Sequence, residues 1–158
     1  MKPAVFLAYL DDSVRAMVIA KLKAVGVKPE RVMNDENTSF SALQKALGKH
    51  NFEMLIQDVA KLDATIKMLT THLDDPVRFI AAAAAVPDDV VARLGGSGTL
   101  QANKGLGCPE ALAKASALAK ALHKFVPEAN AKLAVLEEKL WDVMRRDCTV
   151  LSTLTQRL

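Results

Sequence analysis

The fold is decided by the stretch "NFEMLIQDVAKLDATIKMLTTHL", residues 51–73. With Ile56 left out, its larger apolar residues return in alternating steps of three and four, which places them along one face of an α-helix. The alternation continues over three repeats of seven residues, the heptad pattern of helices that pack along one another. The stretch therefore predicts a long helix with one buried face. This face consists of Phe52, Leu55, Val59, Leu62, Ile66, Leu69 and Leu73.

A second long helix is predicted near residues 129–158. After Leu140, a strict heptad would place Asp147 in the apolar face, where an unpaired charge is costly. In that arrangement Asp147 would need a basic partner and could select the register and the partner helix. We favour a four-residue shift of phase, which moves Asp147 to the rim and buries Cys148 instead. The shifted face consists of Leu133, Leu136, Leu140, Met144, Cys148 and Leu151.

Shorter helical segments account for most of the remaining sequence. Gly26 and Gly48 are natural C-terminal stops, while Pro109 and Pro127 suit the beginnings of helices. No segment alternates convincingly between apolar and polar residues, as a strand with one buried face would. We therefore predict an all-α protein, a compact bundle of five to seven helices that forms a single domain over residues 1–158.

Five consecutive alanines interrupt this pattern of larger apolar residues in "RFIAAAAAVPDD", residues 78–89. The segment reads as a helix that Pro87 closes, because the residue before a proline is disfavoured in the α conformation. Successive helical residues turn by about 100°, so the alanines leave no face of the segment with bulk. We expect other helices to pack closely around it, or else a partner helix to dock on it. The candidate partner contacts are Ala81, Ala82, Ala83, Ala84 and Ala85.

Glycine is concentrated in one part of the chain, since five of the seven glycines lie between Gly95 and Gly107. Glycine-rich loops can bind phosphate through backbone amides, but the P-loop spacing is absent and no strand pattern precedes this stretch. We predict a flexible connection near residues 95–107, which separates an N-terminal set of helices from a C-terminal hairpin. The alternative is a phosphate or nucleic-acid contact through Gly96, Ser97, Gly98 and Lys104.

The composition indicates a folded protein with a mixed-charge surface. The chain is 51% hydrophobic and its net charge is +3, a small basic excess for a dedicated nucleic-acid binder. Cys108 and Cys148 match neither zinc-site nor redox-motif spacing, which favours reduced thiols inside the cell. The first residues lack the features of a signal peptide, and no apolar run approaches the roughly 18 to 20 residues of a membrane span. We therefore expect a cytoplasmic protein without a membrane partner.

No catalytic, metal or cofactor site is predicted. Three pairs of adjacent aspartates stand at helix starts, where capping of backbone amides explains them. His50, His72 and His123 have no partner at helical ligand spacing, and neither cysteine has a nearby base in the sequence.

One local pattern favours DNA binding. Residues 41–57, "SALQKALGKHNFEMLIQ", place two helical pieces on either side of Gly48, which loosely suggests a helix-turn-helix. Acidic residues along the second piece oppose a phosphate-lined groove. The basic residues of the helix near 109–126 offer another candidate surface. The candidate nucleic-acid contacts are Lys45, Lys49, Lys104, Lys114, Lys120 and Lys124.

Taken with the absence of a catalytic pattern, the long helix faces favour a protein that acts through contact. We predict a non-enzymatic helical interaction or assembly module, a subunit or adaptor of a larger complex, that requires no cofactor. The partner would be another protein or a second copy of the chain, because an apolar helix face is satisfied equally by either. The alternative is a small helical nucleic-acid-binding accessory subunit or regulator.

Overall fold

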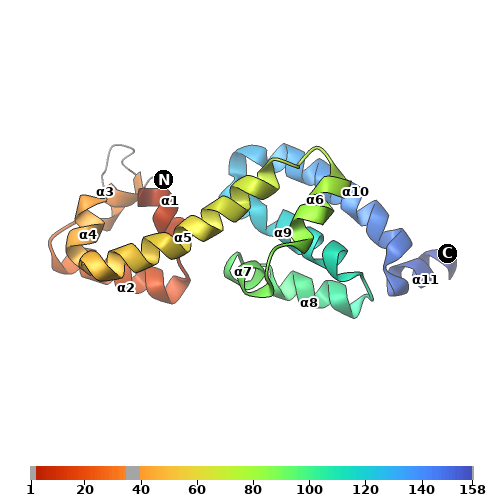
Figure 1. The fold of residues 1–158 in the computed structure, drawn as a ribbon, viewed down its shortest axis with the longest axis horizontal. Coiled ribbons are helices and arrows are strands. Elements are labelled where there is room, and N and C mark those ends of the chain that lie inside the picture. Colours follow the sequence, from red (N-terminus) through yellow and green to blue (C-terminus); the bar gives the residue numbers. More distant parts are fainter. Residues whose placement is uncertain (1–2, 35–39, 158) are drawn as a thin grey trace. The chain divides into compact units, whose positions relative to one another are not determined.

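The computed structural model describes residues 3–34 and 40–157, and it confirms the all-α prediction (Figure 1). Helices make up most of the described residues, and no strand occurs among them. The described part of the chain forms eleven α-helices rather than the predicted five to seven. Two of the additional helices are α8 (Ser97–Gly105) and α11 (Thr149–Arg157), which lie where a flexible connection and a continuous long helix were predicted.

The contacts of the chain divide it into two compact units, residues 1–64 and 65–158. The boundary falls inside the long helix α5 (Lys49–Thr70), so each unit contains part of that helix. The single domain expected over residues 1–158 stays a prediction, which the number of unfolding transitions would test.

The N-terminal unit packs short helices around an aromatic cluster. The ring centroids of Phe6, Phe40 and Phe52 lie 5.7 to 6.1 Å apart, the usual range for packed aromatic pairs. Gly48 has a φ of 82°, a left-handed conformation that ends one helix immediately before the next begins. The helices of this unit are α1 (Pro3–Ala8), α2 (Asp12–Ala24), α3 (Pro29–Asn34), α4 (Ser41–Leu47) and the first part of α5.

Two polar side chains fix the segment that follows α1. Arg15 donates from Nε to the carbonyl of Leu7 at 3.0 Å and from Nη2 to the carbonyl of Leu10 at 2.8 Å, which satisfies acceptors near the helix end. The Tyr9 hydroxyl donates to Asp63 Oδ1 at 2.8 Å. Burial, together with this hydrogen bond, raises the pKa of Tyr9 and keeps the hydroxyl protonated.

The predicted face of residues 51–73 is largely buried. Six of its seven residues are buried and Leu55 is partly buried, although α5 ends at Thr70, before Leu73. The burial follows from the helical spacing of these residues along α5.

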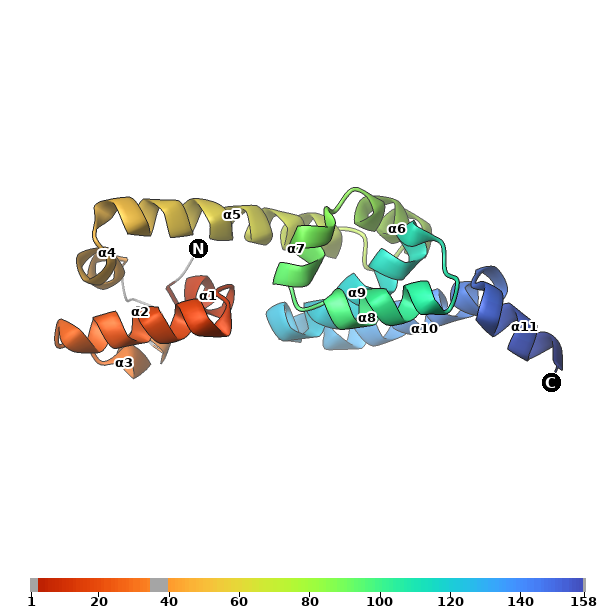
Figure 2. The same cartoon turned by 90° about the horizontal axis from the view of Figure 1, so that it is seen from below.

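The C-terminal unit is built around α9 (Glu110–Phe125), which packs against α6, α8 and α10 (Figures 1 and 2). Eight of its residues are buried, and four of them are alanines, whose small side chains allow neighbouring helices to approach closely. The other elements of this unit are α6 (Pro76–Ala84), α7 (Asp88–Arg93), α8, the 3₁₀ helix η1 (Pro127–Ala129), α10 (Asn130–Asp147) and α11.

The alanine run of α6 is packed on one face and not enclosed on all sides, and docking of a partner helix on it stays a prediction. Ala83 is fully buried and Ala82 partly buried, whereas Ala81, Ala84 and Ala85 are exposed. The reason is that α6 uses one face for packing, and Ala83 shares that face with the buried Phe79 four residues earlier. The alanine-rich helix that neighbours surround is α9.

A helix also replaces the predicted connection at residues 95–107. Gly95 has a φ of 86° and turns the chain after α7, and α8 then begins at Ser97. Gly96 is needed for packing, because a Cβ there would lie 2.9 Å from Val91 Cγ1. Gly95 therefore serves a tight turn, and Gly96 serves a close contact between α7 and the start of α8.

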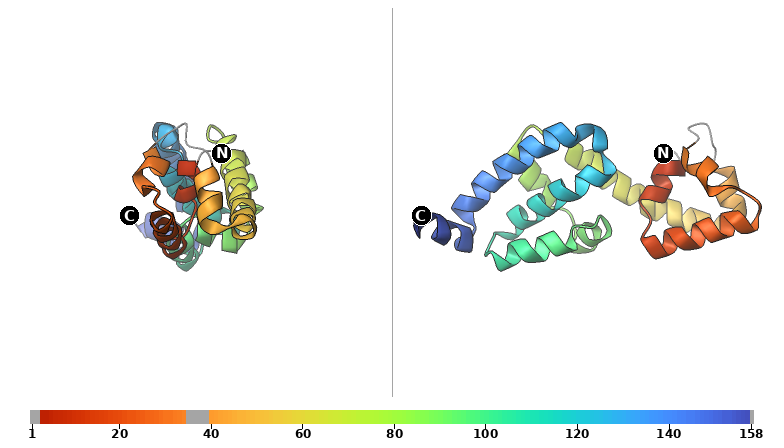
Figure 3. Two further views of the ribbon diagram at one scale, coloured as in Figure 1. Left: turned by 90° about the vertical axis from the view of Figure 1, so that its left-hand side faces the viewer. Right: turned by 180° about the vertical axis from the view of Figure 1, so that it is seen from behind.

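The C-terminal pattern follows the predicted shift of phase. Met144 and Cys148 are buried and Asp147 is exposed. The predicted single helix near 129–158 is nevertheless wrong, because Cys148 adopts an extended backbone conformation (φ −85°, ψ 124°) that separates α10 from α11 (Figure 3). At this break the Cys148 side chain is buried in the interior.

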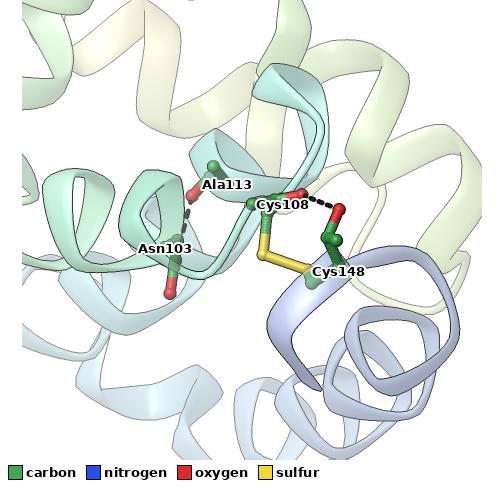
Figure 4. The surroundings of a disulfide bond; sticks show 6 residues. Asn103, Cys108, Ala113 and Cys148 are labelled. Carbon is green, nitrogen blue, oxygen red and sulfur yellow. Dashed lines mark hydrogen bonds between the residues drawn. A yellow bond between two sulfur atoms is a disulfide. The ribbon is translucent and has the colours of Figure 1, made fainter. Parts of the chain in front are cut away.

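Cys108 and Cys148 form a disulfide, which overturns the expectation of reduced thiols (Figure 4). The bond joins the start of α9 to the end of α10 across 40 residues of sequence. Two backbone hydrogen bonds lie beside the disulfide. Thr149 N donates to Gly107 O at 3.3 Å, and Val150 N donates to Leu106 O at 3.1 Å. Nearby, Asn103 Nδ2 donates to the carbonyl of Ala113 at 3.3 Å. The first turn of α11 is thus held to the loop before α9.

Candidate functional site

The candidate site is an open groove of about 740 Å³ between the antiparallel helices α9 and α10. We call it the α9–α10 groove. Its size is within the range of small-molecule sites, and its open shape along two helices also suits a partner helix. The groove is lined by Ser116, Lys120, His123, Ala134, Glu137, Glu138, Trp141, Asp142, Met144 and Arg145.

His123 joins the two walls of the groove. Its Nδ1 lies 2.8 Å from Asn130 Oδ1, and its Nε2 is hydrogen-bonded to Glu137 Oε1. The hydrogen bond to Glu137, followed by the one to Asn130, raises the pKa of His123 above its ordinary value. Both ring nitrogens face oxygen acceptors, an arrangement that the doubly protonated imidazolium satisfies fully. His123 therefore links the two helices at one end of the hairpin, and both of its partners favour the protonated ring.

Some charged side chains of the groove are paired with each other within the chain. Glu137 is paired with His123, and Arg145 is paired with Asp142 one turn away on α10. Lys120 on the α9 wall and Glu138 on the α10 wall are both exposed. Within the described residues neither has an ion-pair or hydrogen-bond partner, so they are the unpaired positive and negative charges of the groove walls.

Trp141 is the only tryptophan of the chain, and it remains 46% exposed on the wall of the groove. Beside it, Met144 is buried and contributes an apolar lining. A large aromatic ring left half in water next to an apolar surface gains free energy when a partner covers it.

The hydroxyl and the imidazole of the groove are not placed as a nucleophile and its base. Ser116, the hydroxyl residue of the lining, stands seven positions before His123 on α9, which is about 10 Å along the helix axis. A nucleophile and its base must lie within about 3 Å, and the nitrogens of His123 already have other partners. Among the described residues, no group of three or more His, Cys, Asp or Glu side chains is placed to hold a metal ion.

Lys114, predicted as a nucleic-acid contact, is a buried residue that forms a network with two exposed carboxylates. Its Nζ donates to the carbonyl of Val86 at 3.0 Å and forms ion pairs with Asp88 at 3.3 Å and Glu110 at 3.6 Å. A buried ammonium group requires such partners. The network ties the turn between α6 and α7 to α9 and engages the Lys114 ammonium within its own chain. A nucleic-acid contact of Lys114 stays a prediction.

The other candidate lysines are at the surface of their own units. Lys45 and Lys49 are exposed on either side of Gly48, in the N-terminal unit. Lys104 Nζ lies 3.9 Å from Asp88 Oδ2, and Lys124 Nζ lies 5.5 Å from the centre of the Phe125 ring.

A second hollow, of about 450 Å³, lies between α8 and α9 and is lined by residues that are distant in the sequence. Lys120 and Lys124, one turn apart on α9, line it with Gly98 and Thr99 from the first turn of α8. The predicted phosphate contacts Gly96, Ser97 and Lys104 are not among its lining residues.

The pairing of His123 with Glu137 was not predicted, because the two residues are not at the short spacing of partners on one helix. Each residue stands seven positions from Asn130, one on α9 and one on α10. In an antiparallel hairpin, residues at equal distances from the turn face each other. The proline-marked turn near Pro127 is therefore the signal by which this pair could have been found.

Comparisons with protein-family models, curated proteins and solved structures find no match to this chain. No described helix is sufficiently long and apolar to cross a membrane.

Proposed function

We propose that the protein is a non-enzymatic helical interaction and assembly module, a subunit or adaptor that binds its partner in the α9–α10 groove. The observation that carries the proposal is Trp141, which is 46% exposed beside an apolar lining. Tryptophan is enriched among the residues that supply most of the binding free energy at protein interfaces. Its exposure in the isolated chain is accounted for if a partner covers it.

A binding role also agrees with the chemistry of the groove. The nitrogens of His123 are engaged by Asn130 and Glu137, so this imidazole is not placed as a base for the groove's hydroxyl group. Charges of both signs line the walls, a pattern typical of surfaces that recognise a mixed-charge helix.

Capture of partners by groove variants tests the proposal. Immobilised protein with the natural sequence should recover a specific protein from an extract of its source cells, and Trp141→Ala should lose it. Val135→Ala is the matched control, because Val135 is also exposed on α10 but lies outside the groove lining. Equal recovery by all three proteins would contradict a role for the groove.

Nucleic-acid binding is the second candidate function, and the hollow shared by Lys120 and Lys124 favours it. Two ammonium groups one turn apart can contact neighbouring phosphates. Titration with duplex DNA and with single-stranded RNA at two salt concentrations tests this function. Binding that weakens with salt and is lost in Lys120→Gln with Lys124→Gln would support it; no binding at low salt would exclude it.

The location of the protein is part of the proposal. A cytoplasmic location stays a prediction from the sequence, and the disulfide weighs against it, because disulfides persist mainly in oxidising compartments. The redox state of Cys108 and Cys148 in protein isolated under acid trapping of thiols distinguishes the two settings.

A further inference from the structure

We infer that the occupant of the α9–α10 groove is a second copy of this chain, related to the first by a two-fold axis that runs along the groove. The inference rests on the proposed function and specifies its partner. It follows from the charges that are left unpaired on the two walls.

Each wall offers one charge that its own chain does not neutralise. Lys120 projects from the α9 wall and Glu138 from the α10 wall, whereas Glu137 and Asp142 are already paired with His123 and Arg145. One unpaired positive and one unpaired negative charge make the groove complementary to itself.

The direction of the two-fold axis follows from the need to place the α9 wall of one copy opposite the α10 wall of the other. Face-to-face docking about an axis along the groove sets α9 of one copy opposite α10 of the other. An axis across the groove would instead set α9 against α9, and the two Lys120 side chains would repel each other. Only the first arrangement is isologous and also pairs unlike charges.

The positions of the two residues along the hairpin fit this arrangement. Lys120 stands ten positions before Asn130 and Glu138 stands eight positions after it. At ~1.5 Å of helix rise per residue, their levels along the groove differ by about 3 Å. Long side chains bridge such an offset easily, so docking creates two equivalent Lys120–Glu138 pairs between the copies.

Trp141 supplies the apolar part of the contact. It stands eleven positions after Asn130, at nearly the level of Lys120 on the opposite helix. The two-fold axis therefore places each Trp141 over α9 of the other copy, near the stem of its Lys120. Burying these rings accounts for their exposure in the single chain, and a tryptophan face also attracts an ammonium group.

Charge exchange in the full chain tests the inference. Sedimentation equilibrium over a range of protein concentrations should show a monomer–dimer equilibrium. Lys120→Glu and Glu138→Lys should each weaken the dimer by roughly tenfold or more, because each single change places like charges opposite each other twice. The double variant, which carries both changes, should recover most of the affinity, since the pairs are re-formed with their signs exchanged.

Lys139→Glu is the matched control, because it makes the same charge change on α10 outside the groove lining. It should leave the dimer unchanged, and circular dichroism should show the same helix content for every variant. A monomer at all concentrations, or a dimer that both single variants leave intact, would overturn the inference. If the chain is monomeric but a different protein is captured in a Trp141-dependent way, the proposed function stands and only the self-association is refuted.

Discussion

His123 on α9 and Glu137 on α10 are hydrogen-bonded across the groove at equal distances from Asn130. This bond fixes the register of the hairpin at the end nearest the turn. The disulfide between Cys108 and Cys148 fixes the other end, where α9 begins and α10 stops. The hairpin that carries Trp141 is therefore held by the hydrogen bond of His123 to Glu137 at one end and by a covalent bond at the other.

The link through His123 should make stability depend on pH. Because the folded state raises the pKa of His123, its stabilisation is complete below the unfolded value of about 6.5 and is lost as pH rises through the folded-state pKa. Urea unfolding should show that His123→Gln costs more free energy at pH 6 than at pH 9. Glu137→Gln should remove most of this pH dependence, and an equal cost of His123→Gln at both values would contradict the link.

The disulfide should contribute about 2 to 4 kcal/mol to the free energy of unfolding, because it restricts the unfolded chain over a long loop. Reduction by a dithiol should lower the urea midpoint accordingly. The double variant Cys108→Ala with Cys148→Ala should unfold at the same midpoint with and without reductant. Thiol titration of the denatured, unreduced protein should find no free thiol; two titratable thiols would refute the bond.

Ala83 and Ala81 should respond differently to enlargement, although both lie in the alanine run of α6. Ala83 is fully buried, so Ala83→Leu should cost roughly 1 to 3 kcal/mol through overpacking. Ala81 is exposed, and Ala81→Leu should change the melting temperature little. Equal effects of the two substitutions would show that this face of α6 is not packed as described.

Gly96 and Gly98 form a second matched pair. A Cβ at position 96 would lie 2.9 Å from Val91 Cγ1, so Gly96→Ala should be destabilising by about 1 to 3 kcal/mol. At Gly98, inside α8, nothing lies within 4 Å of a Cβ, and Gly98→Ala should stabilise the helix by up to about 1 kcal/mol. Thermal unfolding of the two variants compares them directly, and a stabilising Gly96→Ala would contradict the packing of Gly96 against α7.

The sequence predicts features that depend on local spacing. The buried face of α5 follows from steps of three and four residues, and the exposure of Asp147 follows from the cost of burying a charge. The cap of α6 is also local, since the Asp75 carboxylate accepts hydrogen bonds from the backbone amides of Val77 and Arg78.

Features that depend on how distant segments meet were missed. The pairing of Cys108 with Cys148 and of His123 with Glu137 requires α9 and α10 to be antiparallel, which no short motif records. The glycines of residues 95–107 indicate flexibility by composition, yet helix α8 forms there because tertiary contacts outweigh weak intrinsic propensity. The sequence indicates a surface cation at Lys114, because nothing local shows that the turn between α6 and α7 places Asp88 beside it.

The emission of Trp141 tests most directly whether a second copy covers the α9–α10 groove. As the only tryptophan, it reports on this one position without labelling. We predict that its emission lies at shorter wavelength in concentrated protein and shifts to longer wavelength on dilution, with a midpoint equal to the dimer dissociation constant. Glu138→Lys should move that midpoint to higher concentration. Emission that stays at the same long wavelength over the whole concentration range would show that no second copy covers the groove.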